Sequence, residues 1–341
     1  MTNDQPAIDG LLVLPRLRIQ NANAISSPLT WGFPSITAFT GLMHALERKL
    51  KPAVPLGLRG VGVICHHFEA QATTGGYTHA FHLTRNPVDK TGATAAIVEE
   101  GRVHLDITLV FGVEFYEGFP VNDPKAEAML VQLISNAVSN MRVAGGSVIP
   151  SPIGQTRARA VPQLLRLGSD FKAREQQFRR ARRQWLPGFA LVSRDDLLQE
   201  RLAELRSAQP EATALDAWLD LSRLNHRSQR AATTDLKTGA TTETVEWTTQ
   251  RRPGWIVPIP VGYGALSEVY PPGAVTNARD AGTPFRFVES LYSMAQWISP
   301  HRLRDASELL WHSHADPAAG LYRCVNAYRD FTSPLSSSND N

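Results

Sequence analysis

The segment VHLDITLV, residues 103–110, gives the clearest strand signal in the chain. Its odd-numbered positions are all apolar, and its even-numbered positions begin with His104, Asp106 and Thr108. A period of two predicts a strand with one buried face and one polar face. The segments on either side of this strand then indicate the fold.

Helix and strand patterns flank this strand in a regular order. Before it come a strand at RLRIQ (16–20), a helix at SITAFTGLMHALERKL (35–50) and a strand at GVGVICHHF (60–68). After it, Asp123 and Pro124 begin a second helix, Gly145-Gly146 end that helix, and SVIP (147–150) is a short strand. The order β-α-β-β-α-β over residues 11–150 predicts an α+β fold with a ferredoxin-like core, similar to an RNA-recognition module.

Two insertions and a C-terminal part are expected around this core. Residues 69–102 carry turn sequences such as Asn86-Pro87 and are expected to form a projecting hairpin. The remaining segments are a basic helical insertion (151–229), a flexible Thr-rich linker (230–250), a C-terminal part that completes the fold (251–330) and a disordered tail (331–341). Within the C-terminal part, helices are expected near FRFVESLYSMAQWI (285–298) and ASELLWHSHA (306–315).

Composition narrows the class of protein. The chain has 341 residues, 43% of them hydrophobic and 20% charged, which suits an ordinary packed core. No apolar run is long enough to span a bilayer, and the first residues lack a signal-peptide pattern. The two cysteines, Cys65 and Cys324, lie far apart and fit a reducing cytosol. A cytoplasmic protein without a membrane partner is therefore expected.

Positive charge is concentrated in one region. The net charge is +3, yet residues 151–230 contain 15 basic and 9 acidic residues. Segment 157–183 alone holds nine cations and two acids, with aromatic residues interleaved. Arg outnumbers Lys by 29 to 6, and Arg can bind phosphate through its planar fork or stack on bases. A GC-rich coding sequence would give the same bias, so composition alone does not decide between these readings.

The sequence contains no recognisable catalytic or metal-binding pattern. GxSxG, Walker, GxGxxG and HExxH motifs are all missing. His312 and His314 would share a face only in a strand, and no third ligand follows at a known spacing. Histidines such as His66 and His104 are interpreted as structural groups, although acid–base chemistry on an RNA phosphodiester is the alternative. No catalytic residue, no metal and no cofactor are expected.

Several long segments resemble a known family. They are LLVLPRLRIQNANAISSPLTWGFPSITAFTGLMHAL, TRNPVDKTGATAAIVEEGR, MRVAGGS, LPGFALVSR, PGWIVPIPVGYGALS and NARDAGTPFRFVESLY. They are similar to the second subunit of the type I-F CRISPR surveillance complex, the Csy complex, and the resemblance runs from about residue 11 to residue 325. That family belongs to the Cas-five group of repeat-associated RNA-binding proteins.

The resemblance implies a fold, a role and a set of partners. The fold would be a modified RNA-recognition module with a thumb-like hairpin and a helical insertion. The role would be to hold the 5′ handle of the CRISPR RNA, to dock the large subunit and to abut the first backbone subunit, meeting target DNA only through the complex. Because a separate endoribonuclease cuts the precursor, the chain is expected to be non-catalytic. A precursor endoribonuclease and a purely structural adaptor are the two alternatives.

The loop Gln20–Ser35 is the first part of the candidate RNA site, because a simple strand–helix connection needs far fewer residues. Asn21 and Asn23 can read base edges or bind phosphate, or instead cap the loop against its own backbone. Ser26 and Ser27 can reach phosphate. Trp31 and Phe33 can stack on bases, or instead pack beneath the loop.

Other candidate residues lie outside the loop. The basic face of the first strand offers Arg16 and Arg18, and the start of the predicted thumb offers Arg85 and Asn86. The family segment MRVAGGS supplies Arg142, Gly145, Gly146 and Ser147. The backbone amides of its Gly-Gly-Ser turn can bind phosphate. On the basic segment, a surface for RNA or a protein partner is predicted at Arg179, Arg180, Arg182 and Arg183, which cannot all face one side of a helix.

Overall fold

The computed structural model describes most of the chain. The described residues are 6–76, 78–85, 88, 91–94, 97–121, 123–150, 160–168, 170–234, 241–250, 252, 254–278 and 280–328. Within these ranges, no helix is both long enough and apolar enough to cross a membrane.

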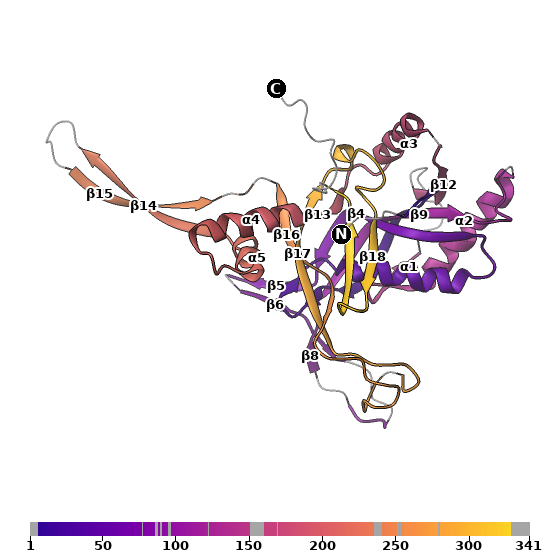
Figure 1. Ribbon diagram of the computed structural model, residues 1–341, viewed down its shortest axis with the longest axis horizontal. Helices are drawn as coiled ribbons and strands as arrows, with labels where there is room; N and C mark the ends of the chain where they lie inside the picture. Colours follow the sequence, from indigo (N-terminus) through magenta and orange to yellow (C-terminus); the bar gives the residue numbers. More distant parts are fainter. Residues whose placement is uncertain are drawn as a thin grey trace.

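An 11-stranded antiparallel sheet forms the body of the molecule (Figure 1). Its order is β10-β11-β1-β9-β4-β13-β17-β16-β19-β18, with β12 paired to β1 beside β11. The strands are β1 (Gly10–Asn23), β4 (Leu56–Ala70), β9 (Arg102–Phe115), β10 (Arg142–Val143), β11 (Gly146–Ile149), β12 (Gln163–Arg166), β13 (Phe189–Ser193), β16 (Trp255–Ala265), β17 (Val288–Ile298), β18 (Trp311–Asp316) and β19 (Leu321–Asn326).

The second half of the sheet closes on itself. On one edge, strand β4 pairs with β13 at Ile64 and Cys65 and with β18 at Val61, which lies opposite Trp311. Strands β4, β13, β17, β16, β19 and β18 therefore form a ring. The buried Trp311 of β18 also contacts β13 inside this ring, because its Nε1 donates to the Leu191 carbonyl at 2.8 Å.

The predicted ferredoxin-like class is wrong for this chain. The early strands β1, β4, β9 and β11 exist, but they do not form a separate small core. Strand β4 continues directly into β13 and the C-terminal strands, and β13, β16 and β17 bury residues in the same hydrophobic cluster as β1 and β9. The result is one large antiparallel sheet whose architecture is dominated by strands.

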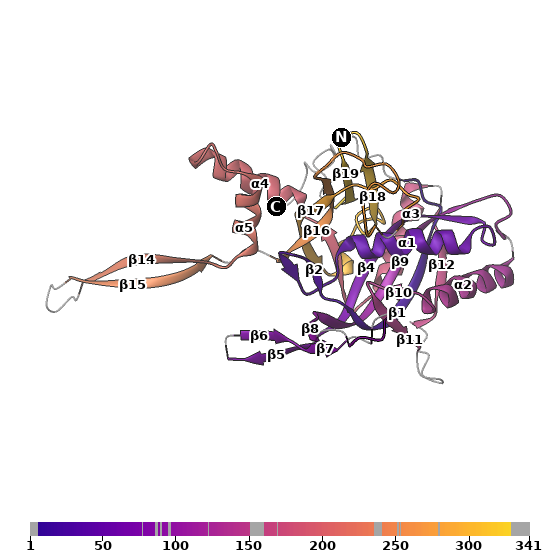
Figure 2. The same ribbon diagram turned by 90° about the horizontal axis from the view of Figure 1, so that it is seen from below.

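Helices cover both faces of the sheet. Helices α1 (Ile36–Leu50) and α2 (Pro124–Ser139) lie on one face, and α3 (Phe171–Arg183) lies on the other (Figure 2). The period-two pattern of β1 explains the two layers, since Leu12 and Leu14 join the core under α1 whereas Leu11 and Val13 join the core under α3. The predicted helix caps are confirmed: Ser35 accepts from Thr37 N, and Asp123 accepts from Lys125 N and Ala126 N.

Two predicted C-terminal helices are strands in the structure. Residues 288–298 form β17, which lies between β13 and β16 and buries side chains on both faces. The apolar residues Leu291, Met294, Ala295 and Ile298 have the spacing of one face of a helix, so the segment is easily mistaken for a helix. Residues 311–316 form β18, preceded by a short 3₁₀ helix at Pro300–Arg302 and turns.

Four hairpins extend from the body. Strands β2 (Ile25–Ser27) and β3 (Thr30–Trp31) lie in the first loop, while β5 (Ala72–Gly75), β6 (Thr78–Phe81), β7 (Leu83–Arg85) and β8 (Ile97–Glu99) lie in the insertion between β4 and β9. The fourth hairpin, β14 (Asn225–Thr234) with β15 (Thr241–Gln250), projects far from the sheet in both views (Figures 1 and 2). The predicted flexible linker is thus wrong for these described residues. Helices α4 (Asp195–Ala208) and α5 (Ala214–Ser222) lie at the base of this hairpin.

Candidate nucleic-acid interface

The first loop is held in shape by its own polar side chains. Thr30 Oγ1 lies 2.7 Å from the hydroxyl oxygens of both Ser26 and Ser27, and Ser27 Oγ also accepts from Thr30 N at 3.1 Å. Asn23 donates to the Ile25 carbonyl at 2.7 Å and accepts from Ile25 N at 3.0 Å. The structure therefore shows Asn23 and Ser27 capping the loop, which was the structural alternative for the Asn pair. Asn21 has a positive φ of 58°, and its exposed backbone N–H donates to His104 Nδ1.

A polar hollow of about 530 Å³ lies on one side of this loop. Four predicted site residues line it together: Asn23, Ser26, Arg142 and Gly145. The beginning of α1 supplies further lining residues, and Tyr263 of β16 completes it. The structure thus brings together residues that are more than a hundred positions apart in the sequence.

The polar hollow has the features of an anion site. The N-terminal end of α1 carries a partial positive charge, and Thr37 and Ala38 in its first turn line the hollow. The Arg142 side chain is exposed and donates from NH1 to the Gly145 carbonyl at 2.9 Å, which holds the guanidinium near the hollow. Because the Ser26 hydroxyl also lines it, this hollow combines a cation, a hydroxyl and a helix end.

An aromatic hollow of about 540 Å³ shares Ser26 with the polar hollow. Four aromatic rings line it while remaining 42–56% exposed: Trp31, Phe68, Phe189 and Trp255. These rings come from four different strands, β3, β4, β13 and β16. The Phe189 and Trp255 rings meet edge to face at 5.5 Å, and Trp31 meets Phe81 of the β5–β6 hairpin at 5.7 Å.

Phe33 has a packing role in the floor of the aromatic hollow. It is half-buried, it stacks on Phe39 with ring centroids 5.8 Å apart, and it meets Trp297 edge to face at 4.8 Å. The two predicted loop aromatics therefore differ: Phe33 packs under the loop, whereas Trp31 presents an exposed ring. From the sequence alone, each ring could either stack on a base or pack beneath the loop.

The polar face of the sheet adjoins the aromatic hollow through His66. Its Nδ1 lies 2.6 Å from the Pro187 carbonyl, and its Nε2 lies 2.8 Å from Thr108 Oγ1. Burial lowers the His66 pKa, and the nearby charge of Arg16 lowers it further. A neutral ring that donates through Nδ1 satisfies both contacts, so His66 is a structural group with both nitrogens engaged.

The two predicted strand cations have different surroundings. Arg16 lies at a bulge with φ 56°, and its NH1 is 3.3 Å from Asp106 Oδ2. Arg18 is exposed and lies opposite Asp106 in the strand register. Arg18 is therefore the more accessible of the two. Next to His66, Cys65 lines the aromatic hollow, and burial raises the pKa of its thiol to about 12.

The MRVAGGS segment forms a hairpin turn, so the prediction that Gly145-Gly146 end a helix is wrong. Helix α2 stops at Ser139, and β10 and β11 then pair across a two-residue turn. Ala144 (φ 50°) and Gly145 (φ 80°) both have positive φ, as a type I′ turn requires. Ser147 is exposed on β11, opposite Gln20 of β1.

The other predicted site residues do not line either hollow, and one of them lies outside the described residues. Arg85 ends β7, its side chain is not among those described, and Asn86 lies outside the described residues. Arg179, Arg180, Arg182 and Arg183 belong to α3 and line neither hollow. Arg179 pairs with Glu175 at 2.7 Å. Burial lowers the pKa of Arg182, as do the charges of Arg179 and Arg183.

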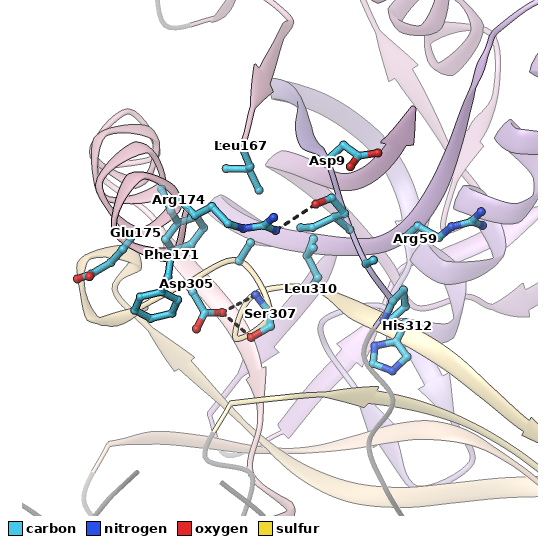
Figure 3. A pocket seen from close by; sticks show the side chains of 15 residues that line it. Asp9, Arg59, Leu167, Phe171, Arg174, Glu175, Asp305, Ser307, Leu310 and His312 are labelled. Atoms are coloured by element: carbon cyan, nitrogen blue, oxygen red, sulfur yellow. Dashed lines mark hydrogen bonds between the residues drawn. The ribbon is translucent and has the colours of Figure 1, made fainter. Parts of the chain in front are cut away.

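A third cavity of about 430 Å³ lies where α3 meets the sheet and the segment before β18 (Figure 3). Arg174 crosses this cavity and donates from NH2 to the Ile8 carbonyl at 3.0 Å. Asp305 accepts from Ser307, and Arg59 pairs with Glu114. Its polar groups are largely satisfied within the chain, and none of the four predicted α3 arginines lines it.

The sequence reasoning missed Phe68, Phe189, Trp255 and Tyr263. Three of them lie within or beside segments that already marked the family, LPGFALVSR and PGWIVPIPVGYGALS, but isolated aromatics in strands are normally core residues. Only the sheet order shows that β13 and β16 carry these rings to the first loop. Among the described residues, no group of three His, Cys, Asp or Glu side chains is placed to hold a metal ion.

Comparison with known proteins gives consistent matches. The model of a family described as CRISPR-associated protein (Cas_Csy2) matches residues 12–324. The chain is also 50% identical over 317 residues to a protein of Pseudomonas aeruginosa strain UCBPP-PA14 that is named CRISPR-associated protein Csy2. That alignment covers 92% of this chain and 94% of the relative.

Proposed function

Because the chain belongs to the Csy2 family of CRISPR-associated proteins, which confirms the resemblance found in its sequence, we propose that it is a non-catalytic subunit that holds the 5′ handle of a CRISPR RNA. The observation that carries this proposal is the pair of hollows that share Ser26 of the first loop. One is polar and contains Arg142, and the other is lined by four exposed aromatic rings.

The two hollows suit the two parts of a single-stranded nucleotide. Exposed aromatic rings accept bases by stacking, which is typical of proteins that bind single-stranded RNA. A guanidinium, a hydroxyl and a helix N-terminus accept phosphate. Since Ser26 lines both hollows, a strand that crosses the loop can place a phosphate in the polar hollow and a neighbouring base in the aromatic hollow.

The chemistry of the site favours binding over cleavage. A ribonuclease that uses general acid–base catalysis needs a titratable group within reach of the RNA. His66 uses both ring nitrogens in contacts within the chain, and the thiol of Cys65, with a pKa of about 12, stays protonated at neutral pH. The candidate interface therefore offers contacts to RNA without an activated nucleophile among these residues.

The partners follow from the same proposal. We take them to be the CRISPR RNA, the large subunit and the backbone subunit of the Csy complex, with target DNA reached through the assembled complex. A subunit that grips one end of the RNA and contacts two protein subunits would fix the position of that end in the assembly.

The test of this proposal removes the exposed rings. In the assembled complex, Trp31→Ala with Phe68→Ala should weaken protection of the RNA 5′ handle from nuclease. Each lost stacking contact is worth about 1–3 kcal/mol, so two should lower affinity for the handle by about 30-fold or more. The matched control is Phe171→Ala, which removes an exposed ring from α3 that lines neither hollow.

Thermal melts of all variants show whether the fold is kept. The Trp31 and Phe68 rings are both exposed, so a normal melt is expected for each variant. Full protection of the handle in the Trp31/Phe68 variant, with a normal melt, would remove the aromatic hollow from the RNA site.

A further inference from the structure

A phosphate held in the polar hollow belongs to two nucleosides, because each phosphodiester joins a pair. The proposed function places the base of one of them in the aromatic hollow, on rings such as Trp31. The base on the other side of the same phosphate also needs a surface, and in protein-bound single strands that surface is commonly an aromatic ring. Among the described residues that line the polar hollow, Tyr263 of β16 is the one that carries such a ring.

The Tyr263 ring is supported by a neighbour and remains accessible. Its centroid lies 6.3 Å from that of Tyr322 on the adjacent strand β19, with an angle of 31° between the ring planes. Tyr322 in turn packs against the main hydrophobic core. Tyr263 is nevertheless 41% exposed. A ring that is already held in one orientation loses little freedom when a base stacks on it.

The backbone of β16 is shaped to place this ring. A register shift lies between Pro260 and Gly262, directly before Tyr263, and a bulge can re-aim the side chain beside it. A Cβ on Gly262 would clash with the Tyr322 carbonyl oxygen, so glycine allows β16 to lie this close to β19. The Pro260 carbonyl accepts a hydrogen bond at 3.3 Å from Ser35, the N-cap of α1. Strand β16 is thus joined both to the strand that supports Tyr263 and to the helix that lines the polar hollow (Figure 2).

The surroundings of Tyr263 favour a nucleotide over a protein as its partner. The same hollow is lined by Arg142, whose side chain is exposed, and by Ser26. A protein-binding surface gathers several large apolar anchors, whereas a nucleotide presents a flat ring next to a negative charge. One aromatic ring beside one cation and one hydroxyl matches a nucleotide.

We propose that Tyr263 forms a second base subsite of the RNA interface, on which a base of the 5′ handle stacks. This inference rests on the proposed function, because that function supplies the phosphate in the polar hollow. The two bases that flank this phosphate then lie in different hollows, one on the rings of the aromatic hollow and the other on Tyr263. They therefore do not stack on each other, and the strand is unstacked at this step.

The first test changes this ring in the assembled complex. Tyr263→Ala should make nuclease cleave the handle about tenfold faster, a loss typical of one base–aromatic stack. Tyr263→Phe should keep full protection, because the phenyl ring stacks in the same way. The matched control is Tyr270→Ala, since Tyr270 is 40% exposed, lies on the connection between β16 and β17 and lines neither hollow. Thermal melts of each variant show whether the fold is kept.

The second test uses guide RNAs that each lack one base of the handle. In the parent complex, loss of the base that stacks on Tyr263 should weaken protection. In the Tyr263→Ala complex, loss of that same base should have no further effect, because the ring and the base act as one pair. A purely structural role of Tyr263 predicts instead that each missing base has the same effect in both complexes. The nucleotide identified in this way should be the direct neighbour of the one identified with the Trp31/Phe68 variant.

Three results would overturn this inference. They are full protection of the handle in the Tyr263→Ala complex, additive effects at every handle position, and loss of a protein subunit while the handle stays protected, which would make Tyr263 a protein contact. Any of them, together with lost protection in the Trp31/Phe68 variant, would reject the second subsite and leave the proposed function in place. Full protection in both variants would reject the proposed RNA site as well.

Discussion

At the residue scale, Gly146 shows how closely the candidate interface is packed. A Cβ at this position would lie 2.7 Å from Ile19 Cγ2 and 2.8 Å from both Ala22 N and Gln20 O. Two of these atoms belong to the backbone of β1, so they cannot move without disturbing the pairing of β1 with β11. The glycine therefore allows the β10–β11 turn to approach the strand that leads into the first loop.

We predict opposite effects for two small substitutions in this turn. Gly146→Ala should lower the melting temperature, because its methyl group meets backbone atoms. Ala144→Gly should raise it, because Ala144 has a φ of 50°, a conformation that glycine adopts without strain, and the gain should be about 1 kcal/mol. Thermal melts of the two variants measure both effects. Equal destabilisation by the two changes would mean that the turn is not held as described.

The loop side chains show what a sequence cannot decide at this scale. Asn, Ser and Thr can bind RNA or close a turn with the same atoms. In the structure, Asn23 and Ser27 use their side chains inside the loop, whereas Asn21 leaves its side chain exposed. Residue type therefore marked this loop as a candidate site, but the division of roles among its side chains depended on the folded loop.

At the scale of elements, Asp220 holds the base of the β14–β15 hairpin, called here the arm, through Arg201, Arg252 and Asn225. Its ionisation gives a prediction about pH. Burial alone would raise its pKa, but hydrogen bonds from Arg252 and Arg201 outweigh that effect and lower the pKa to about 2. A carboxylate with a lowered pKa stabilises the folded state above its unfolded pKa of 3.8, and this contribution is lost as the pH falls through about 2.

Asp220→Asn should therefore destabilise the α4–α5 unit and the arm at neutral pH. Removing one member of a buried ion pair costs about 3–5 kcal/mol, since Arg201 and Arg252 would keep their charges without a carboxylate. The difference between the variant and the parent should shrink as the pH falls from about 4 to about 2. The measurement is a pH series of thermal melts with Glu200→Gln as the control, because Glu200 is an exposed carboxylate on the neighbouring helix α4. A difference that stays constant over this pH range would contradict the role of the ionised carboxylate.

The sequence predicted some elements well and others badly, for physical reasons. Helix α1, helix α2 and strand β9 have strong periodicity and clear caps, and they were found in the right places. Strand β17 is buried on both faces, so it lacks the alternation that identifies a strand. The arm was predicted as a linker because it is polar and Thr-rich, yet Thr also has a high strand propensity and pairs well across a hairpin.

At the scale of the whole molecule, the large sheet could not be predicted from the sequence, because its strand pairings join distant parts of the chain. Strand β13 pairs with β4 across more than a hundred residues, and β18 pairs with β4 across a longer interval. Local patterns report whether a segment is a strand but not which neighbour it takes. The same pairings create the aromatic hollow, so four of its residues could not be assigned to one site before the sheet order was known.

The sheet also predicts which parts of the molecule unfold locally and which unfold only with the whole. The core under α1 and the core under α3 use alternate residues of the same strands, for example Leu12 and Val13 of β1, so neither core can be lost alone. The arm has no core along its strands, and its base depends on the small cluster of Trp218, Leu221 and Met294. Opening free energies within one protein range from near zero to the global value, according to such differences in burial.

Hydrogen exchange measured by mass spectrometry should therefore divide the isolated chain into two parts. Peptides from β1, β4 and β9 should exchange slowly and together, whereas peptides from β14 and β15 should exchange much faster, because the arm can open while the sheet stays closed. Asp220→Asn should speed exchange in the arm and leave the β9 peptides unchanged, which serves as the internal control. Arm peptides that are as protected as β9 in the isolated chain would show that the arm is already covered, and that its open edges and exposed Trp247 do not describe the free protein.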